Sequence, residues 1–295
     1  MHPSGLLAPP TNTVGEVPHR EIDVHFQGAE QAVCTHVIDG YLVDPGPDSS
    51  VGTLLAALGD ERPEAVLLTH IHLDHAGGVG ALVEKWPDLE VWVHENGARH
   101  VIDPSRLVAS ASRIYGDAME RLWGRIVPVP EANVRILSGE GGEAGPFEWA
   151  YTPGHAVHHA AYRHKDTNIV FSGDVAGVRI GDGPILPPTP PPDIDVEAWH
   201  ASIERIAAWE PAALAITHFG TFADDVPRHL AVLHEELDRW AQVARRTDEA
   251  GFEAEIRAAL AGSDQEQGYL KAMPPDTLYG GLARYWKKRD TAAST

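Results

Sequence analysis

One short segment, residues 69–75 with the sequence THIHLDH, limits more than any other what this chain can fold into. It carries four potential metal ligands within six positions: His70, His72, Asp74 and His75. On extended backbone the side chains at positions i and i+2 lie on the same side, so His70 and His72 can bind one metal ion. Asp74 and His75 lie around the following turn and can face a second ion. The segment therefore predicts a metal-binding turn directly after a strand.

Three more potential ligands follow the same local pattern farther along the chain. His155 stands in TPGH after a strand-like segment, Asp174 in SGD after NIVFS, and His218 in THFG after ALAIT. All four positions thus come directly after a short apolar segment that is typical of a buried strand. In a sheet of neighbouring strands such positions share one edge, so we predict that these ligands converge into a single site.

The remaining sequence predicts alternating strands and helices followed by an all-helical end. Strands are expected within residues 14–44 and at 65–69, 89–95, 133–137, 147–152, 168–172 and 213–217. Helices are expected at 50–58, 79–86, 195–209 and through most of 98–124. Residues 181–193 are rich in proline and glycine, which favours a stiff, extended connector. After residue 222 the pattern is helical, and its apolar face is expected to pack on the core or on a partner subunit.

The ligand candidates are five histidines and two carboxylates. Imidazole with carboxylate suits zinc, iron or manganese, and the lack of a nearby thiolate argues against a closed structural zinc site. The single cysteine, Cys34, lies in an alternating apolar stretch and is interpreted as a packed hydrophobic residue. Two metals about 3.5–4 Å apart could share Asp174 and keep positions open for water and substrate. The predicted ligands are His70, His72 and His155 for the first metal and Asp74, His75 and His218 for the second.

In their order along the chain, the motifs H-x-H-x-D-H, T-P-G-H, S-G-D and a strand-terminal histidine resemble those of the metallo-β-lactamase-fold hydrolase superfamily over residues 14–222. The resemblance implies an α+β fold of four layers, an αββα sandwich in which two packed sheets lie between outer helices. Residues 223–295 would then form a C-terminal helical extension. Residues 98–124 would be a helical insertion that either covers the metals as a lid or supports the sheet.

Carried over by position, the resemblance assigns the same seven residues as metal ligands. It makes Asp174 the bridging aspartate and Asp44, in LVDPG, an acid that supports a ligating histidine. His158 and His159 follow His155 closely, and His159 is expected to support the ligands rather than to bind metal. Members that hydrolyse β-lactams use a cysteine or lack the bridging aspartate. This ligand set is instead similar to that of glyoxalase II-type thioesterases, lactonases and phosphodiesterases, and TPGHAVHHAAY with THFG resembles a poorly characterised group of prokaryotic hydrolases.

The resemblance implies a hydrolase with two divalent metal ions, expected to be Zn²⁺, with iron or manganese as alternatives. A hydroxide that bridges the ions would attack a small ester, thioester, lactone or phosphodiester, and Asp74 would bind metal and orient that hydroxide. The alternative is a persulfide dioxygenase-like oxidoreductase, which shares the fold and part of the motif but uses a single iron. Asp74, His75 and His218 favour the hydrolase, because they complete a second metal site.

Charge and composition bear on partners and location. The chain has 23 Lys and Arg against 43 Asp and Glu, a net charge of −20, and no basic run. This argues against nucleic acid, an anionic membrane or an RNA-processing nuclease of this fold. No apolar stretch approaches the roughly 18 residues that span a bilayer. The start lacks the features of a secretory signal and one cysteine suits a reducing compartment, so we expect a cytoplasmic protein with a small-molecule substrate; homo-oligomer formation is left open.

Overall fold

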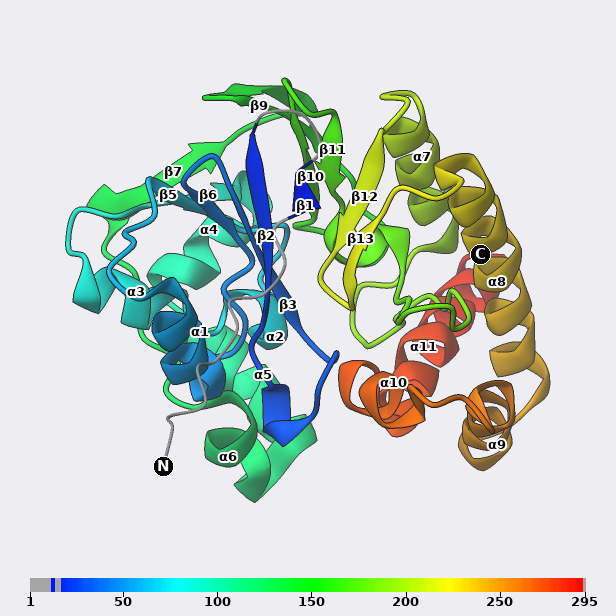
Figure 1. Cartoon of the computed structure of the whole chain (residues 1–295). Helices are drawn as coiled ribbons and strands as arrows, with labels where there is room; N and C mark the ends of the chain where they lie inside the picture. The colour runs from blue at the N-terminus through cyan, green and yellow to red at the C-terminus, as the bar shows by residue number, and fades with distance from the viewer. Residues whose placement is uncertain (1–11, 14–16, 294–295) are drawn as a thin grey trace, which may run out of the picture.

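A computed structural model describes residues 12–13 and 17–293. The expected start of the domain at residue 14 lies outside the described residues. So does most of the N-terminal segment in which no secretory signal is expected. Two sheets occupy the middle of the structure (Figure 1). Helices α1–α6 lie on the side of one sheet and α7–α11 on the side of the other, as the same view shows.

The first sheet has the strand order β1-β2-β3-β4-β5-β6-β7 within the described residues. Its early strands pair antiparallel, whereas β4, β5, β6 and β7 run parallel. The strands are β1 (Asn12–Thr13), β2 (Pro18–Asp23), β3 (Cys34–Ile38), β4 (Tyr41–Val43), β5 (Ala65–Leu67), β6 (Glu90–His94) and β7 (Val134–Leu137). The helices between them are α1 (Val51–Leu58), α2 (Leu73–Ala76), α3 (Val79–Lys85), α4 (Glu95–Ile102), α5 (Ser105–Tyr115) and α6 (Met119–Trp123).

The second sheet has the order β13-β12-β11-β10-β9-β8, and only the pair β11 and β12 is parallel among its described strands. The strands are β8 (Gly141–Ala144), β9 (Phe147–Tyr151), β10 (Ala160–His164), β11 (Ile169–Phe171), β12 (Ala213–Ile216) and β13 (Gly220–Phe222). The accompanying helices are α7 (Val196–Ala207), α8 (Val226–Arg246), α9 (Glu249–Leu260), α10 (Glu266–Ala272) and α11 (Pro275–Ala293).

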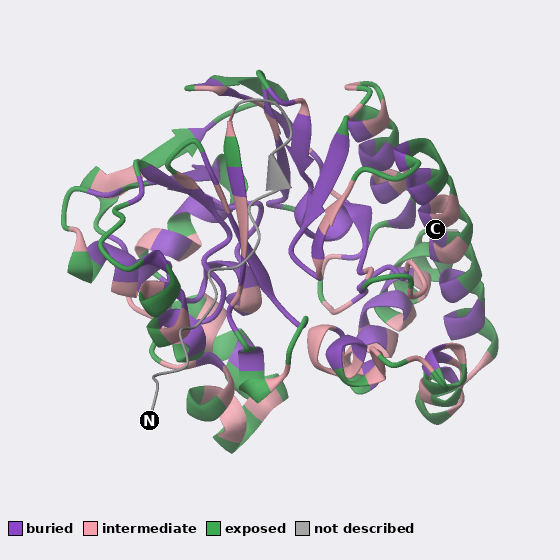
Figure 2. Ribbon diagram, viewed as in Figure 1, coloured by how far each residue is buried: buried purple, intermediate pink, exposed green. Residues whose placement is uncertain are grey.

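The central strands are buried on both faces, which explains why they read as uninterrupted apolar runs. Successive residues of a strand point to opposite faces of its sheet. In β11, Phe171 packs between the two sheets, whereas Val170 packs under the C-terminal helices. In β5, Leu67 packs between the sheets and Val66 under the first set of helices. Three apolar clusters therefore separate four layers, with the strands buried between them (Figure 2), and the predicted αββα sandwich is confirmed.

Most expected elements are present. The sequence patterns did not predict β8 (GGEA), β10 (AAYRH) or β13 (GTF). The helical pattern of residues 98–124 is confirmed by α4, α5 and α6. The C-terminal helices pack on the second sheet: Leu233 and Trp240 of α8 share an apolar cluster with Leu214 of β12. Of the two alternatives for that apolar face, packing on the chain's own core is therefore correct.

Candidate metal centre

The ligand candidates lie in the segments that follow four strands. After β5 the chain passes through the 69–72 segment into α2, and His72 is the extended residue that precedes this helix. His155 follows β9, Asp174 lies in the short 3-10 helix η5 (Gly173–Ala176) after β11, and His218 follows β12. One of these strands belongs to the first sheet and three to the second, so the site is assembled where the ends of the two sheets meet. The structure brings the seven predicted side chains together in two groups.

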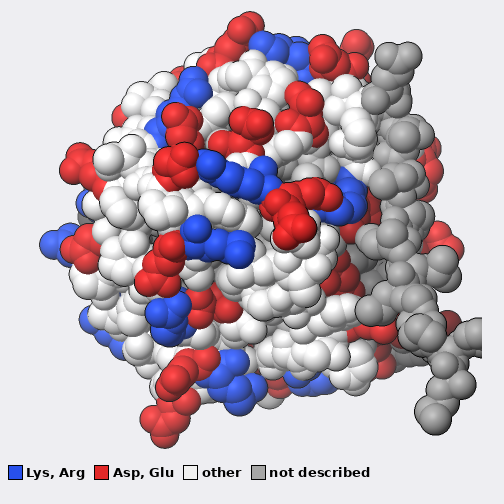
Figure 3. All heavy atoms as spheres, turned by 60° about the vertical axis from the view of Figure 1, so that its left-hand side comes forward, with Lys and Arg blue, Asp and Glu red and all other residues white. Residues whose placement is uncertain are grey.

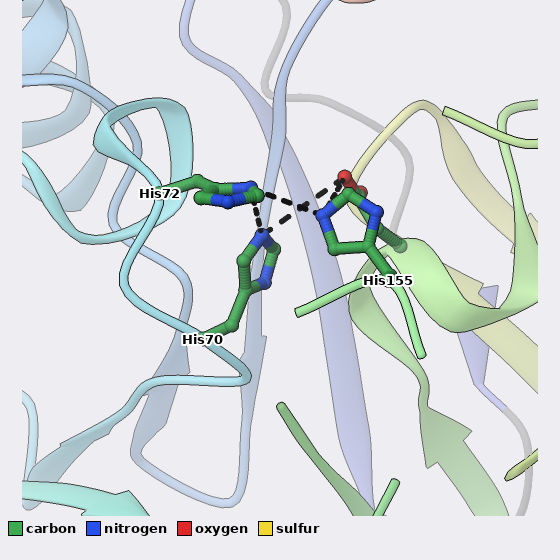
Figure 4. Close-up of side chains that lie close together, drawn as sticks. His70, His72 and His155 are labelled. Carbon is green, nitrogen blue, oxygen red and sulfur yellow. Dashed lines mark hydrogen bonds and ion pairs between the residues drawn. The ribbon is translucent and has the colours of Figure 1, made fainter. Parts of the chain in front are cut away.

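The first group contains three histidines whose ring nitrogens point toward one another (Figure 4). His72 Nδ1 lies 3.0 Å from His70 Nε2 and 3.0 Å from His155 Nε2. Asp174 Oδ2 lies 3.2 Å from His155 Nε2 and 4.0 Å from His70 Nε2. These four atoms lie within 4.8 Å of one another. Such a spacing suits ligands that surround one cation at about 2.0–2.2 Å.

The second group contains Asp74, His75 and His218. Asp74 Oδ2 lies 3.4 Å from His218 Nε2 and 3.8 Å from His75 Nε2. Asp174 turns its other oxygen, Oδ1, to this group, at 3.3 Å from His75 Nε2 and 3.5 Å from His218 Nε2. One oxygen of Asp174 therefore faces each group, as expected for a carboxylate shared between two cations.

Hydrogen bonds fix the orientation of four of the five histidine rings. Each of these rings has Nδ1 next to an oxygen, and an N–H donated there leaves the lone pair on Nε2, which faces the ligand group. The Nδ1 partners are Thr69 Oγ1 for His70 at 3.1 Å, the Pro188 carbonyl for His155 at 2.9 Å, Asp44 Oδ2 for His75 at 2.8 Å and the Ala32 carbonyl for His218 at 2.6 Å. The rings are thus oriented to offer acceptors, not donors, to the centre of each group.

Among the ligand candidates, three buried atoms have no hydrogen-bond partner in the described part of the chain: His75 Nε2, His218 Nε2 and Asp174 Oδ1. A buried acceptor without a partner is costly, and such atoms are rare in folded proteins. A divalent cation would satisfy all three acceptors at once. The donor set of imidazole nitrogens and carboxylate oxygens suits such a cation. The residues present therefore fit two divalent metal ions.

Asp44 lies fully buried behind the second group and accepts four hydrogen bonds. Its Oδ1 accepts from the Thr69 N–H at 2.8 Å. Its Oδ2 accepts from Thr69 Oγ1 at 2.6 Å, His75 Nδ1 at 2.8 Å and Thr217 Oγ1 at 3.0 Å. The sequence analysis missed both threonines, although each directly precedes a ligand candidate in the repeated pair Thr-His. Asp44 therefore anchors the ends of β5 and β12 together with one ligand ring.

Burial and the nearby carboxylates determine the protonation of the two groups. Burial alone would lower the pKa of His75, but the three surrounding carboxylates raise it well above its usual value. Asp174 and Asp74 likewise raise the pKa of His218 against the effect of burial. In the first group burial dominates and lowers the pKa of His155 to about 3. The carboxylates of the second group therefore favour positive charge at this position, which a bound cation would supply.

His159 and His158 lie beside the first group without joining it. His159 Nδ1 is 2.8 Å from Thr152 Oγ1, and its ring centroid is 5.1 Å from that of His70. His158 accepts the Ile71 N–H at 3.4 Å, and its ring is stacked 6.1 Å from that of His70. Burial lowers the pKa of both residues, so they pack as neutral rings. His159 therefore lies next to the ring of His70, and its supporting role stays a prediction.

A cavity of about 160 Å³ opens onto the two groups. His72, Asp74 and Asp174 line it, so both groups have a ligand candidate that reaches this space. Its other walls come from the 3-10 helix η1 (Phe26–Gly28), from α5 and α6, from the proline-rich segment, and from the end of α10, the connection to α11 and the start of α11. The cavity is therefore built by both sets of helices.

The cavity changes the interpretation of two segments. The proline-rich segment is not merely a connector, because Pro188 and residues 190–192 form one wall of the cavity. Residues 98–124 both line the cavity and pack on the core: Ile114 lines the cavity, whereas Ala111 and Trp123 line it and also pack under the first sheet. Whether the segment acts as a lid stays a prediction.

The cavity also has walls that the sequence analysis missed. The segment after residue 222 was expected only to be helical and to pack through its apolar face, but Lys271, Met273 and Leu278 line the cavity. The signal was the pair Pro274-Pro275, which ends one helix and starts the next at this point. Phe26 and Gln27 of η1 carried no comparable signal.

Comparisons with known proteins agree with this geometry. The sequence model of the Metallo-beta-lactamase superfamily matches residues 35–218. Hydroxyacylglutathione hydrolase from Pseudomonas aeruginosa is 31% identical over 270 residues, which cover 83% of this chain and 88% of that protein. Hydroxyacylglutathione hydrolase from Ectopseudomonas mendocina is 28% identical over 267 residues, which cover 84% and 89%.

Solved structures give the same result for the fold. The archaeal metallo-beta-lactamase superfamily protein ST1585 from Sulfolobus tokodaii has a TM-score of 0.64 at 23% identity and covers 90% of this chain and 97% of its own. The metallo-beta-lactamase family protein TTHA1429 from Thermus thermophilus has a TM-score of 0.60 at 22% identity, with coverages of 88% and 89%. The family model spans more than half of the chain and includes all seven ligand candidates. This chain is thus a metal-dependent hydrolase that belongs to the metallo-beta-lactamase superfamily.

Proposed function

We propose that this chain uses two divalent metal ions to hydrolyse a small ester, thioester, lactone or phosphodiester. The observation that carries the proposal is the position of Asp174, whose two oxygens face two separate groups of ligand candidates. The buried acceptors without a partner support it as well. Relatives that carry the name hydroxyacylglutathione hydrolase support hydrolytic chemistry.

The residues around the cavity have two roles in this proposal: they bind metal and they orient the attacking water. The first and second groups would each hold one cation, with Asp174 shared between them. When bound, two such cations lower the pKa of a water molecule and withdraw electrons from the scissile carbonyl or phosphoryl group. Asp74 lines the cavity, and its neighbouring histidines hold its pKa at about 2 against the opposing effect of burial. Asp74 therefore stays ionised at neutral pH and can accept a hydrogen bond from the attacking water and orient it.

We propose zinc as the metal, with iron and manganese as alternatives. The two groups offer nitrogen and carboxylate oxygen without a thiolate, a donor set that all three metals accept. The alternative of a persulfide dioxygenase-like enzyme with a single iron needs only the first group. The completeness of the second group favours the dinuclear hydrolase.

We also propose a small-molecule partner rather than nucleic acid or a membrane surface. The net charge of −20 disfavours polyanionic partners. Figure 3 shows one face of the molecule on which Lys and Arg are interspersed with Asp and Glu. In the described part of the chain, no helix combines the length and the apolar character that crossing a bilayer requires. A cytoplasmic location is proposed from the single, buried Cys34, and homo-oligomer formation stays open.

A hydrolysis panel on protein of known metal content tests the proposed function. The panel contains esters, thioesters, lactones, phosphodiesters and glutathione persulfide, and elemental analysis gives the metal content of the same sample. We expect hydrolysis of at least one class by protein with two metal ions per chain. Oxygen uptake with glutathione persulfide by protein that holds one iron would establish the alternative instead.

The variant His72→Ala tests the role of the first group. His72 lies in a loop before α2 and reaches the cavity, so its removal should spare the fold while it removes a ligand. We expect kcat to fall at least about 100-fold, since even residues behind a metal ligand cost 10–100-fold. His200→Ala on α7, whose side chain is 26% exposed, is the control and should keep full activity. Full activity of metal-loaded His72→Ala would contradict the assignment.

A further inference from the structure

The walls of the cavity above the ligand groups are predominantly apolar. Leu107, Ile114 and Leu122 of α5 and α6 contribute aliphatic side chains. Met273 and Leu278 contribute further apolar side chains from the C-terminal helices, and prolines cover another side. Burial of apolar surface is the main source of affinity that such walls offer to a ligand.

The cavity wall also carries few charged side chains that could pair with a substrate. Of the described residues that line it, Lys271 is the single Lys or Arg, and its Nζ lies 3.3 Å from Gln27 Oε1. The remaining polar groups away from the metal ligands are neutral and include the hydroxyls of Ser110, Tyr115 and Thr277. A carboxylate brought into such a site without a cation to pair with is penalised by desolvation. Apart from the proposed metal ions, the cavity therefore offers a single cationic side chain to an anionic group.

The size of the cavity also favours a small ligand. Its volume of about 160 Å³ is below the roughly 300–1,000 Å³ of pockets that enclose drug-sized ligands. A short alkyl chain or a single aromatic ring would occupy the space next to the ligand groups.

We propose that the substrate is a small ester, thioester or lactone with an apolar acyl group, and that the chain discriminates against glutathione thioesters. This inference rests on the proposed hydrolytic function. The apolar acyl group lies against Ile114, Leu107 and Met273, while its carbonyl faces Asp74 and the two ligand groups. Lys271 pairs with one anionic group on substrates that carry it. Glutathione has two carboxylates, so one of them would lack a cationic partner in this cavity.

The first test measures binding and does not depend on turnover. The full-length, metal-containing protein is titrated calorimetrically with benzylacetone, a neutral ketone that cannot be hydrolysed, and with S-methylglutathione. We expect saturable binding of benzylacetone at least about tenfold tighter than that of S-methylglutathione. Equal or tighter binding of S-methylglutathione would overturn the inference, whether or not the protein hydrolyses any ester.

A pair of matched variants locates the binding. Ile114 lines the cavity and is 53% exposed, so Ile114→Asp places a charge in the apolar wall without disturbing the core. Ile136 on β7 is 49% exposed and lies outside the cavity, which makes Ile136→Asp the control. We expect Ile114→Asp to weaken benzylacetone binding at least about tenfold and Ile136→Asp to leave it unchanged. An equal effect of both variants, or of neither, would overturn the location.

The second test separates this inference from the proposed function. We expect kcat/KM for phenyl- or alkyl-substituted acyl esters to exceed that for S-lactoylglutathione at least tenfold. We also expect Lys271→Met to lower kcat/KM more strongly for acyl esters that carry a carboxylate than for neutral ones. A preference for S-lactoylglutathione overturns the inference but keeps the hydrolase. Absence of all hydrolysis, together with binding of benzylacetone that Ile114→Asp weakens, overturns the function but keeps the apolar site.

Discussion

Asp44 connects strand ends of both sheets at a position that no substrate reaches. It adopts a φ of 49°, a left-handed conformation that Asp tolerates better than most residues. Its carboxylate receives donors from Thr69 after β5, from Thr217 after β12 and from the His75 ring. Four donors surround the two oxygens of Asp44, so both atoms at these positions have to accept hydrogen bonds. A carboxylate accepts on both atoms, whereas the carboxamide of Asn accepts on one atom and donates from the other.

The variant Asp44→Asn tests this role. The NH2 group of the introduced Asn would face one of the groups that donate hydrogen bonds to Asp44. We therefore expect the His75 ring to lose its fixed orientation and the metal affinity to fall about 10–100-fold. Competition with a chromophoric chelator measures that affinity. Asp39→Asn is the matched control, since Asp39 has the same φ of 49° but a side chain that is 54% exposed. Equal metal affinity in the two variants would show that Asp44 does not support the ligands.

The sequence predicts the ligand candidates better than the groups that orient them. Side chains such as His155 belong to short motifs with a recognisable spacing. The partners of His155 and His218, in contrast, are the backbone carbonyls of Pro188 and Ala32, which any residue could supply. Such partners depend on the three-dimensional path of the chain, so no sequence motif predicts them.

The 3-10 helix η5 positions Asp174 through a glycine. Gly173 has a φ of 47°, and a Cβ atom there would lie 2.5 Å from Thr69 Oγ1 and 2.7 Å from His159 Nε2. This close approach brings Asp174 next to the β5 loop of the opposite sheet. A side chain at position 173 would have to push the two loops apart.

The variant Gly173→Ala tests whether this close approach is needed. Gly59→Ala is the matched control, because Gly59 has a φ of 61° but open space around its Cβ position. Both variants place an alanine at a positive φ, which carries a conformational cost at either position. We expect only Gly173→Ala to lose bound metal and most of its activity, as measured by elemental analysis and ester hydrolysis. Loss of metal in both variants, or in neither, would contradict the proposed role of the contact.

At the level of elements, short apolar runs identify several strands that are buried on both faces, although β10, which is also mostly buried, has no such run. β5, β11 and β12 are short apolar runs because helices or the other sheet cover each face. β8 contains two glycines and an exposed glutamate, and it is a strand because it pairs with β9 at the edge of the sheet. Its pairing is a tertiary effect that local propensity does not contain.

At the scale of the whole molecule, the C-terminal helices are part of the site as well as of the core. Residues 271–278 wall the cavity, and His229 of α8 has Nε2 2.8 Å from the Ala176 carbonyl in η5. Burial lowers the pKa of His229 to about 4. The folded chain therefore keeps this ring neutral, whereas the unfolded chain protonates it below about pH 6.5.

A pH dependence of stability follows from His229. Because its folded pKa is below its unfolded value, stability is lost as the pH falls from about 6.5 to about 4. By pH 5 this residue should cost roughly 2 kcal/mol relative to pH 8. His229→Gln keeps an N–H donor but cannot titrate. In urea unfolding we expect the stability of wild type relative to His229→Gln to fall by about this amount between pH 8 and pH 5. A difference that is independent of pH would contradict this.

Elemental analysis of the wild-type chain and of Asp174→Ala, purified in the same way, tests most directly whether one carboxylate joins two metal sites. We expect two divalent ions per wild-type chain and fewer than two per Asp174→Ala chain, with the fold unchanged by circular dichroism. A wild-type chain that binds a single ion, or an Asp174→Ala chain that retains two, would contradict a dinuclear centre bridged by Asp174.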